Sequence, residues 1–140
     1  MTTFNNIVIV AHDSMKPDLV SFLKDRQDWL WGRTLVATGQ TAEYIKDTEF
    51  TVPVQHVSRG REGGYKELAE MVKRGEVRLV IFFRDPEIIQ DYQDEVVEFI
   101  KTCNRENTPL ATNPASAELL ILGMIRMESA QQTKTRNEAE

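Results

Sequence analysis

Residues 79–83 read Leu-Val-Ile-Phe-Phe, an unbroken apolar stretch of the 140-residue chain. A stretch in which apolar residues do not alternate with polar ones is typical of a strand buried on both faces. Residues 7–10, Ile-Val-Ile-Val, have the same character. The two stretches together predict a parallel sheet that is covered by helices on both sides.

Three shorter β-branched or apolar stretches predict the remaining strands. They lie at residues 34–36, 52–54 and 110–112. Pro53 removes a backbone donor from the second of them, which makes that stretch an edge strand or the start of a strand.

Helical patterns separate these stretches along the chain. Gly75 stands where a helix C-terminal cap is expected, and Asn113 with Pro114 suits the start of the last helix. The predicted helices cover residues 17–24, 65–74 and 92–105 and a final segment that begins near residue 114. Strands that alternate with helices predict an α/β fold, a three-layer, doubly wound structure around a five-stranded parallel sheet.

Size and composition place further bounds on the protein. The length suits one domain, over residues 1–128, followed by a polar tail over 129–140 that is expected to be disordered or loosely attached. A net charge of −5 argues against a dedicated nucleic-acid binder. Cys103, the single cysteine, is expected in the core. The sequence has neither a membrane-spanning apolar run nor a leader pattern in MTTFNN, which predicts a cytoplasmic protein.

The polar residues that follow the five stretches form the candidate site. Ligands bind beyond the carboxyl ends of the strands in an open parallel sheet, so these residues are expected at one edge. They are His12, Asp13 and Lys16; Thr38, Gly39, Gln40 and Thr41; residues 58–64; Arg84, Asp85 and Pro86; and Thr112 and Asn113. Hydroxyls, an ammonium group and glycine N–H groups suit a small anion.

Each residue also has a purely structural interpretation. His12 could cap a helix or bond to a backbone carbonyl, and Asp13 could be a helix N-cap. Asp85 could only shape a turn, and Arg59 and Arg61 could be solvated loop charges. The convergence of all these residues on one edge, rather than any single one, predicts a binding site.

Four segments resemble the methylglyoxal synthase family, in order and at similar spacing. They are VAHDSMK (10–16), ATGQT (37–41), IFFRDP (81–86) and PLATNPASAE (109–118). The resemblance covers about residues 6–120. It implies a lyase that takes dihydroxyacetone phosphate, removes a carbon-bound proton and eliminates phosphate to leave methylglyoxal, with no metal or organic cofactor. It also implies a homo-oligomer, typically a hexamer, and Trp29 and Trp31 are consistent with one.

The resemblance further implies which residues hold the ligand or its phosphate. They are His12, Lys16, Thr38, Gly39, Gln40, Thr41, Arg59 and Gly60. Gln40 replaces a family threonine, and the family serine before Gly60 either becomes Arg59 or shifts to Ser58.

Departures from the family pattern fall on the reacting side. The family's catalytic aspartate follows the double glycine, where this chain has Tyr65. A phenol with a pKa near 10 is a poor base at neutral pH. The family's histidine aligns with Tyr92, and the aspartate three residues later aligns with Glu95. The C-terminal arginine that completes a neighbour's phosphate site in the family has no clear counterpart in the polar tail.

Three functions are therefore weighed. The leading hypothesis is a protein that binds a small phosphorylated metabolite or phosphate without efficient catalysis and acts as a sensor, a regulator or a partner protein. The second is an active methylglyoxal synthase with a relocated base, for which the candidates are Asp13, Asp85, Glu62 and Glu95. The third is a structural subunit with a vestigial pocket.

Overall fold

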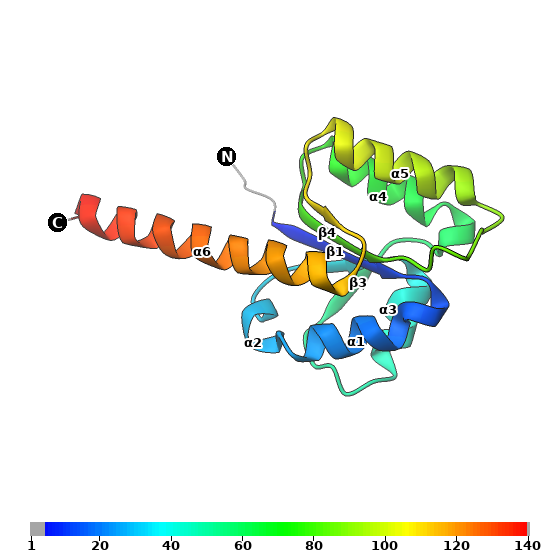
Figure 1. Ribbon diagram of the computed structural model, residues 1–140, viewed down its shortest axis with the longest axis horizontal. Coiled ribbons are helices and arrows are strands. Elements are labelled where there is room, and N and C mark those ends of the chain that lie inside the picture. The colour runs from blue at the N-terminus through cyan, green and yellow to red at the C-terminus, as the bar shows by residue number, and fades with distance from the viewer. Residues whose placement is uncertain (1–4, 140) are drawn as a thin grey trace.

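The structure is a computed structural model that describes residues 5–139 (Figure 1). Residues 1–4 and 140 lie outside the described residues, as do the parts of the expected N-terminus and tail that fall on them. The strands are β1 (Asn6–Ala11), β2 (Leu35–Ala37), β3 (Val54–His56), β4 (Val77–Phe83) and β5 (Leu110–Ala111). They form one sheet in the order β3-β2-β1-β4-β5, and every pairing is parallel. The predicted α/β fold is confirmed.

Helices cover both faces of this sheet. They are α1 (Lys16–Lys24), α2 (Gln27–Leu30), α3 (Gly39–Lys46), α4 (Gly64–Lys73), α5 (Gln93–Arg105) and α6 (Pro114–Ala139). Figure 1 shows α4 and α5 on one side of the sheet and α1, α2 and α3 on the other. Two short 3-10 helices, Asp13–Met15 and Gly60–Glu62, precede α1 and α4.

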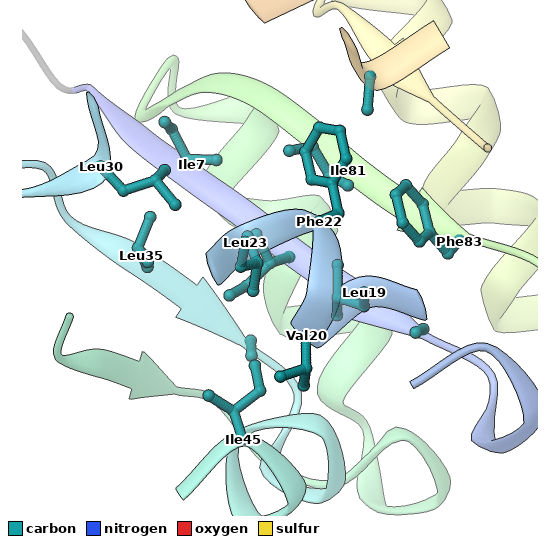
Figure 2. Packing of buried hydrophobic residues seen from close by; sticks show 14 of the residues in the cluster. Ile7, Leu19, Val20, Phe22, Leu23, Leu30, Leu35, Ile45, Ile81 and Phe83 are labelled. Carbon is teal, nitrogen blue, oxygen red and sulfur yellow. The ribbon is translucent and has the colours of Figure 1, made fainter. Parts of the chain in front are cut away.

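Successive residues of β1 and β4 face opposite layers, as the unbroken apolar stretches require. Ile7, Ile9 and Ile81 pack with α1, α2, α3 and α6 (Figure 2). Val8 and Phe82 pack with α4 and α5 in a second cluster, which also holds the fully buried Cys103. Cys103 is therefore a core residue as expected, and its burial raises the pKa of the thiol to about 11.

The peripheral elements β3 and α3 differ from the sequence prediction more than the central strands do. β3 lies two residues later than residues 52–54, because Pro53 cannot donate to the ladder and precedes the strand instead. It is an edge strand, as Pro53 predicts. The sequence prediction missed α3, since its amphipathic pattern begins inside the ATGQT segment that was treated as a site loop.

α6 runs as one helix to Ala139, through most of the segment expected to be a disordered or loosely attached tail. Its residues are good helix formers and include no proline after Pro114, so nothing in the sequence ends the helix. Glu128 makes its last described polar contacts, accepting two hydrogen bonds of 2.8 and 2.9 Å from Arg33 and one of 3.2 Å from Trp29. Residues 129–133 are exposed.

Within residues 5–139, none of the helices combines the length and the apolar character that a membrane crossing requires.

Candidate functional site

A small cavity lies at the carboxyl ends of the central strands. The space open to the centre of a water-sized sphere is about 30 Å³, and one ordered water needs about 10–15 Å³ by a comparable measure. The cavity is lined by Ala11, His12, Asp13, Lys16, Thr38, Gln40, Thr41, Gly60, Arg61, Tyr65, Gln90 and Tyr92. It therefore has room for about two ordered water molecules.

One wall, which we name the polar side, consists of Lys16, Thr38, Gln40 and Thr41. The side chains of Lys16, Thr38 and Thr41 are buried, with 5%, 3% and 1% of their surface exposed. The Thr38 hydroxyl donates to that of Thr41 over 3.2 Å. Thr38 stands immediately before α3 and makes no side-chain capping bond, and the positive end of that helix dipole lies on this side. A buried ammonium, two hydroxyls and a helix N-terminus suit an anion.

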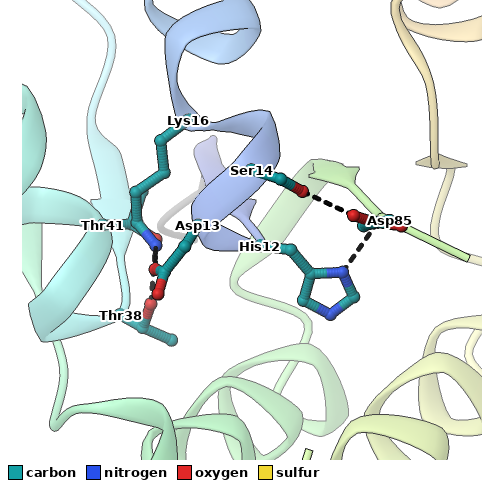
Figure 3. Close-up of polar contacts among 7 residues, drawn as sticks. All are labelled: His12, Asp13, Ser14, Lys16, Thr38, Thr41 and Asp85. Atoms are coloured by element: carbon teal, nitrogen blue, oxygen red, sulfur yellow. Dashed lines mark hydrogen bonds and ion pairs between the residues drawn. The ribbon is translucent and has the colours of Figure 1, made fainter. Parts of the chain in front are cut away.

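Asp13 balances the charge of Lys16. The Lys16 ammonium donates to the Asp13 carboxylate, and the two form an ion pair one helical turn apart (Figure 3). Lys16 is buried whereas the Asp13 side chain is 79% exposed. The hydrogen bond from Lys16 lowers the pKa of Asp13 below its ordinary value. Asp13 is thus ionised at neutral pH and borders the cavity from the solvent side.

His12 is held as a neutral hydrogen-bond donor. Its Nδ1 accepts a hydrogen bond of 2.7 Å from the backbone N–H of Asp85 (Figure 3). The proton of the neutral ring is therefore on Nε2, which is buried and has no partner among the described residues. Burial, and then the charge of Arg84, lower the pKa of His12. The ring thus presents an N–H group to the cavity.

Another part of the lining, which we name the aromatic side, consists of Tyr65 and Tyr92, and Phe82 and Phe99 pack against Tyr65 from the core. The ring of Tyr65 stacks on Phe82 at 5.7 Å between centroids and on Tyr92 at 5.8 Å. Only 4% of Tyr65 is exposed. Burial raises the pKa of both phenols above their ordinary value. Neither phenol is ionised at neutral pH.

The double glycine fixes where Tyr65 stands. Gly63 has a φ of +94°, a left-handed conformation that favours glycine. A Cβ on Gly64 would lie 2.1 Å from the carbonyl oxygen of Ser58, so only glycine fits there. A Cβ on Gly60 would lie 2.8 Å from the ring of Tyr65. The turn is therefore closed tightly over the aromatic side.

The structure brings six of the predicted ligand-binding residues to the cavity, namely His12, Lys16, Thr38, Gln40, Thr41 and Gly60. Gly39 and Arg59 instead line a neighbouring groove of about 760 Å³ beside α3 and β3, where Arg59 pairs with Glu43 over 2.6 Å. That groove is wider, but it lacks the buried polar side chains that converge on the cavity.

Of the four candidate bases, Asp13 alone lines the cavity. Asp85 accepts hydrogen bonds from Ser14 at 2.6 Å and from the N–H of Glu87 at 2.9 Å, which lower its pKa and hold it behind His12. Oε1 of Glu95 lies 3.4 Å from Nζ of Lys66. Glu62 borders the neighbouring groove.

Sequence reasoning missed Gln90, which lines the cavity from the segment between β4 and α5, where no pattern marked it. Arg61, from the candidate segment 58–64, lines the cavity from the short 3-10 helix Gly60–Glu62. Arg84, another candidate, is not among the lining residues. In the described part of the chain, no group of three or more His, Cys, Asp or Glu side chains could hold a metal ion.

Comparison with known proteins identifies the class. The MGS-like domain family matches residues 18–112. A protein named methylglyoxal synthase from Carboxydothermus hydrogenoformans is 36% identical over 115 residues, 82% of this chain and 94% of that protein. One from Cupriavidus pinatubonensis is 35% identical over 129 residues, 92% and 98% of the two chains. The crystal structure of methylglyoxal synthase from Elizabethkingia anophelis NUHP1 superposes with a TM-score of 0.77, at 34% identity, over 86% of this chain and 78% of that one.

This chain belongs to the methylglyoxal synthase family, within the class of MGS-like domains. The two named relatives are matched over 94% and 98% of their length, and the superposition on the crystal structure shows that the fold is shared.

Proposed function

We propose that this protein binds a small phosphorylated metabolite of the triose phosphate class in the cavity between β1, α3 and α4. The observation that carries the proposal is the polar side, where the buried Lys16 ammonium lies beside two buried threonine hydroxyls. Such groups match the oxygens of a phosphate through charge-assisted hydrogen bonds. The names of the relatives support a phosphorylated ligand of this size.

Two functions of such a site are distinguished, and the names of the relatives favour the first, a lyase that converts dihydroxyacetone phosphate into methylglyoxal and phosphate. A base would take a proton from the hydroxymethyl carbon of dihydroxyacetone phosphate, and the electron pair would form an enediolate with the neighbouring carbonyl. The C–O bond to phosphate would then break, and the enol product would tautomerise to methylglyoxal. Asp13 is our candidate base, since it borders the cavity as a carboxylate. His12 would donate Nε2–H to the developing oxyanion.

One observation favours the second function, binding without turnover by a sensor or partner protein. When the chain is aligned with the family motifs, Tyr65 occupies the position of the catalytic aspartate and Tyr92 that of a histidine. Both phenols have raised pKa values, and Gly60 packs directly against the ring of Tyr65. A group that stays protonated is not able to abstract a proton from carbon at neutral pH.

Two measurements on the wild-type protein test the proposal and divide the functions. Phosphate and dihydroxyacetone phosphate should each raise the melting temperature, because a ligand that binds only the native state stabilises it. Unmoved melting curves at millimolar concentrations would end the proposal. Methylglyoxal release that is abolished by Asp13→Asn then identifies the lyase, whereas binding without release identifies the second function.

We also propose a homo-oligomer, with a hexamer suggested by the resemblance. Exposed apolar side chains on α6 support an interface, since Leu119 is 70% and Leu122 51% exposed. Trp31, one of the two tryptophans noted in the sequence, is 53% exposed as well. Light scattering at micromolar concentration tests this proposal, and the mass of a monomer would contradict it.

A further inference from the structure

The charges of the residues that line the cavity do not cancel. The charged residues are Asp13, Lys16 and Arg61, because the lowered pKa of His12 leaves its ring neutral. The Lys16 ammonium is paired with the Asp13 carboxylate, so these two charges balance each other (Figure 3). Among the residues whose side chains the structure describes, none forms an ion pair with Arg61. Arg61 therefore gives the lining its net positive charge.

The turn that carries Arg61 is fixed by backbone hydrogen bonds, whereas the Arg61 side chain is exposed. Arg61 is the middle residue of the short 3-10 helix Gly60–Glu62. The N–H groups of Glu62 and Gly64 both donate to the carbonyl of Arg59, over 2.9 and 3.0 Å. The Arg61 side chain lines the cavity and is also open to solvent. Its guanidinium can therefore turn toward a bound ligand without breaking an ion pair.

The charge of Arg61 acts on two other residues of the lining. The hydrogen bond from Lys16 is the main cause of the lowered pKa of Asp13, and the charge of Arg61 lowers that pKa further. Burial raises the pKa of Tyr92, and the charge of Arg61 opposes the rise. Asp13 follows β1, whereas Tyr92 lies between β4 and α5. An anion that enters the cavity between these segments would lie within reach of the same guanidinium charge.

A phosphate ester needs more room and more positive charge than the lining offers on its own. The space holds about two ordered water molecules, so residues around it have to move when an ester enters. A phosphate monoester carries a charge of about −1.5 to −2 at neutral pH, whereas the charge of Lys16 is already balanced by Asp13. An exposed and unpaired arginine meets both needs, because its side chain can move and its charge is not compensated.

We propose that Arg61 closes over the anionic group of the ligand and makes the site selective for a dianionic ester over a monoanionic one. The proposal rests on the proposed phosphate binding at the polar side. A guanidinium presents its N–H donors in a planar fork that matches two phosphate oxygens, and its attraction grows with the charge of the anion. Arg61 lies on the same chain as Lys16, so one chain supplies both cationic side chains of the site.

The test compares glycerol 3-phosphate with glycerol 3-sulfate, two esters of the same shape. At pH 8 the phosphate ester is a dianion and the sulfate ester a monoanion. Dissociation constants are measured by calorimetry for the wild type, for Arg61→Gln and for Arg61→Lys. We expect the wild type to bind the phosphate ester at least about tenfold more tightly than the sulfate ester, the typical value of one charge-assisted contact. Arg61→Gln should weaken the binding of the phosphate ester by about tenfold and reduce the preference to less than about threefold. Arg61→Lys keeps the charge without the fork, and it should retain part of the preference.

Arg105→Gln is the matched control, because it removes the same charge from an exposed arginine on α5 that pairs with Glu98 over 2.7 Å and does not line the cavity. It should leave both dissociation constants unchanged. A preference that survives Arg61→Gln, or an equal loss of affinity in Arg105→Gln, would overturn the role of Arg61 while phosphate binding stands. If the wild type binds neither ester, the role of Arg61 and the proposed function fall together.

Discussion

The two sides of the cavity are built in different ways, although they line the same small space. On the polar side, a buried lysine and two buried threonines present an ammonium and hydroxyls, and Asp13 supplies the counter-charge. On the aromatic side, Tyr65 and its neighbours stack ring on ring, as in the core beneath them. The polar side resembles a binding site and the aromatic side resembles an extension of the core.

Binding and turnover therefore require different chemical groups in the same cavity. Holding a phosphate requires charge and hydrogen-bond donors, which the polar side retains. Removing a proton from carbon requires a base with a suitable pKa within reach, which the phenols of the aromatic side do not supply. Mutations can therefore alter one side and leave the other intact.

The largest effect is expected from rebuilding a base on the aromatic side. If the wild type binds without turnover, as in the second proposed function, the double variant Tyr65→Asp with Tyr92→His should raise methylglyoxal release from dihydroxyacetone phosphate by about 10²–10⁴ over the wild type, the usual value of a positioned base. Tyr65→Asp alone should restore only a fraction, since Tyr92 still stands at the histidine position. Release is measured at saturating substrate for the wild type and the three variants, including Tyr92→His alone.

Tyr44→Asp, on the outer face of α3, is the control for introducing a carboxylate at a tyrosine position, and it should leave methylglyoxal release unchanged. Wild-type turnover at about 1–10³ s⁻¹, an ordinary enzyme rate, would contradict this expectation. Loss of that turnover in Asp13→Asn would then make Asp13 the base, as in the first proposed function.

The next largest effect is expected on the polar side. Lys16→Ala removes the buried ammonium, and it should weaken the binding of inorganic phosphate by roughly 10–100-fold, as expected for a lost hydrogen bond to a charged group. Lys66→Ala, which removes an exposed lysine on α4, is the matched control. Calorimetric titration of both variants and the wild type measures the change. Unaltered affinity in Lys16→Ala would show that the phosphate is held elsewhere.

The centre of the fold was predictable from the sequence because burial on both faces leaves a continuous apolar signature in β1 and β4. Elements at the periphery were harder, since β3 is paired on one side only and few of its side chains are buried. α3 was missed because its first residues, Gly39, Gln40 and Thr41, belong to the ATGQT motif as well as to the helix.

For the site, topology predicted which segments would meet, because parallel strands end at one edge. It did not predict which side chains would pair. The contact between Lys16 and Asp13 follows from their spacing in one helical turn, but the neighbourhood of His12 and Arg84 depends on the register between β1 and β4. Register is a property of the folded sheet, and the strands' unbroken apolar sequences do not encode it locally.

A smaller effect is expected at Gly60, where the two sides of the cavity meet. A Cβ there would lie 2.8 Å from the ring of Tyr65 and 3.1 Å from that of Tyr92. Gly60→Ala should therefore lower the free energy of unfolding by about 1–3 kcal/mol, the typical cost of overpacking. Gly123→Ala on α6, where a Cβ meets nothing within 4 Å, is the control and should not destabilise. Urea denaturation of both variants measures the difference.

A double variant shows whether the rings cause that loss. Tyr65→Ala removes the ring against which the new Cβ would press. In the Tyr65→Ala background, Gly60→Ala should cost less than it does alone, because residues in contact are not additive. Full additivity of the two changes would mean that Gly60 is constrained by something other than the aromatic side.

The smallest effect is expected from the titration of His12, which lies between the two sides. Burial and the charge of Arg84 lower its pKa in the folded protein below the ordinary 6.5. The unfolded chain therefore binds more protons than the folded one as the pH falls from 6.5 toward the folded pKa, and the stability that His12 contributes is lost over that window. His12→Gln lacks this titration, so its melting temperature should lie below that of the wild type at pH 8, and the gap should narrow from pH 6.5 downward. The melting temperature of His56→Gln, at an exposed position on β3, should change with pH in the same way as that of the wild type. A difference in melting temperature between the wild type and His12→Gln that stays constant from pH 8 to pH 5.5 would show that His12 has the same pKa in the folded and unfolded protein. It would contradict the assignment of His12 as a neutral hydrogen-bond donor.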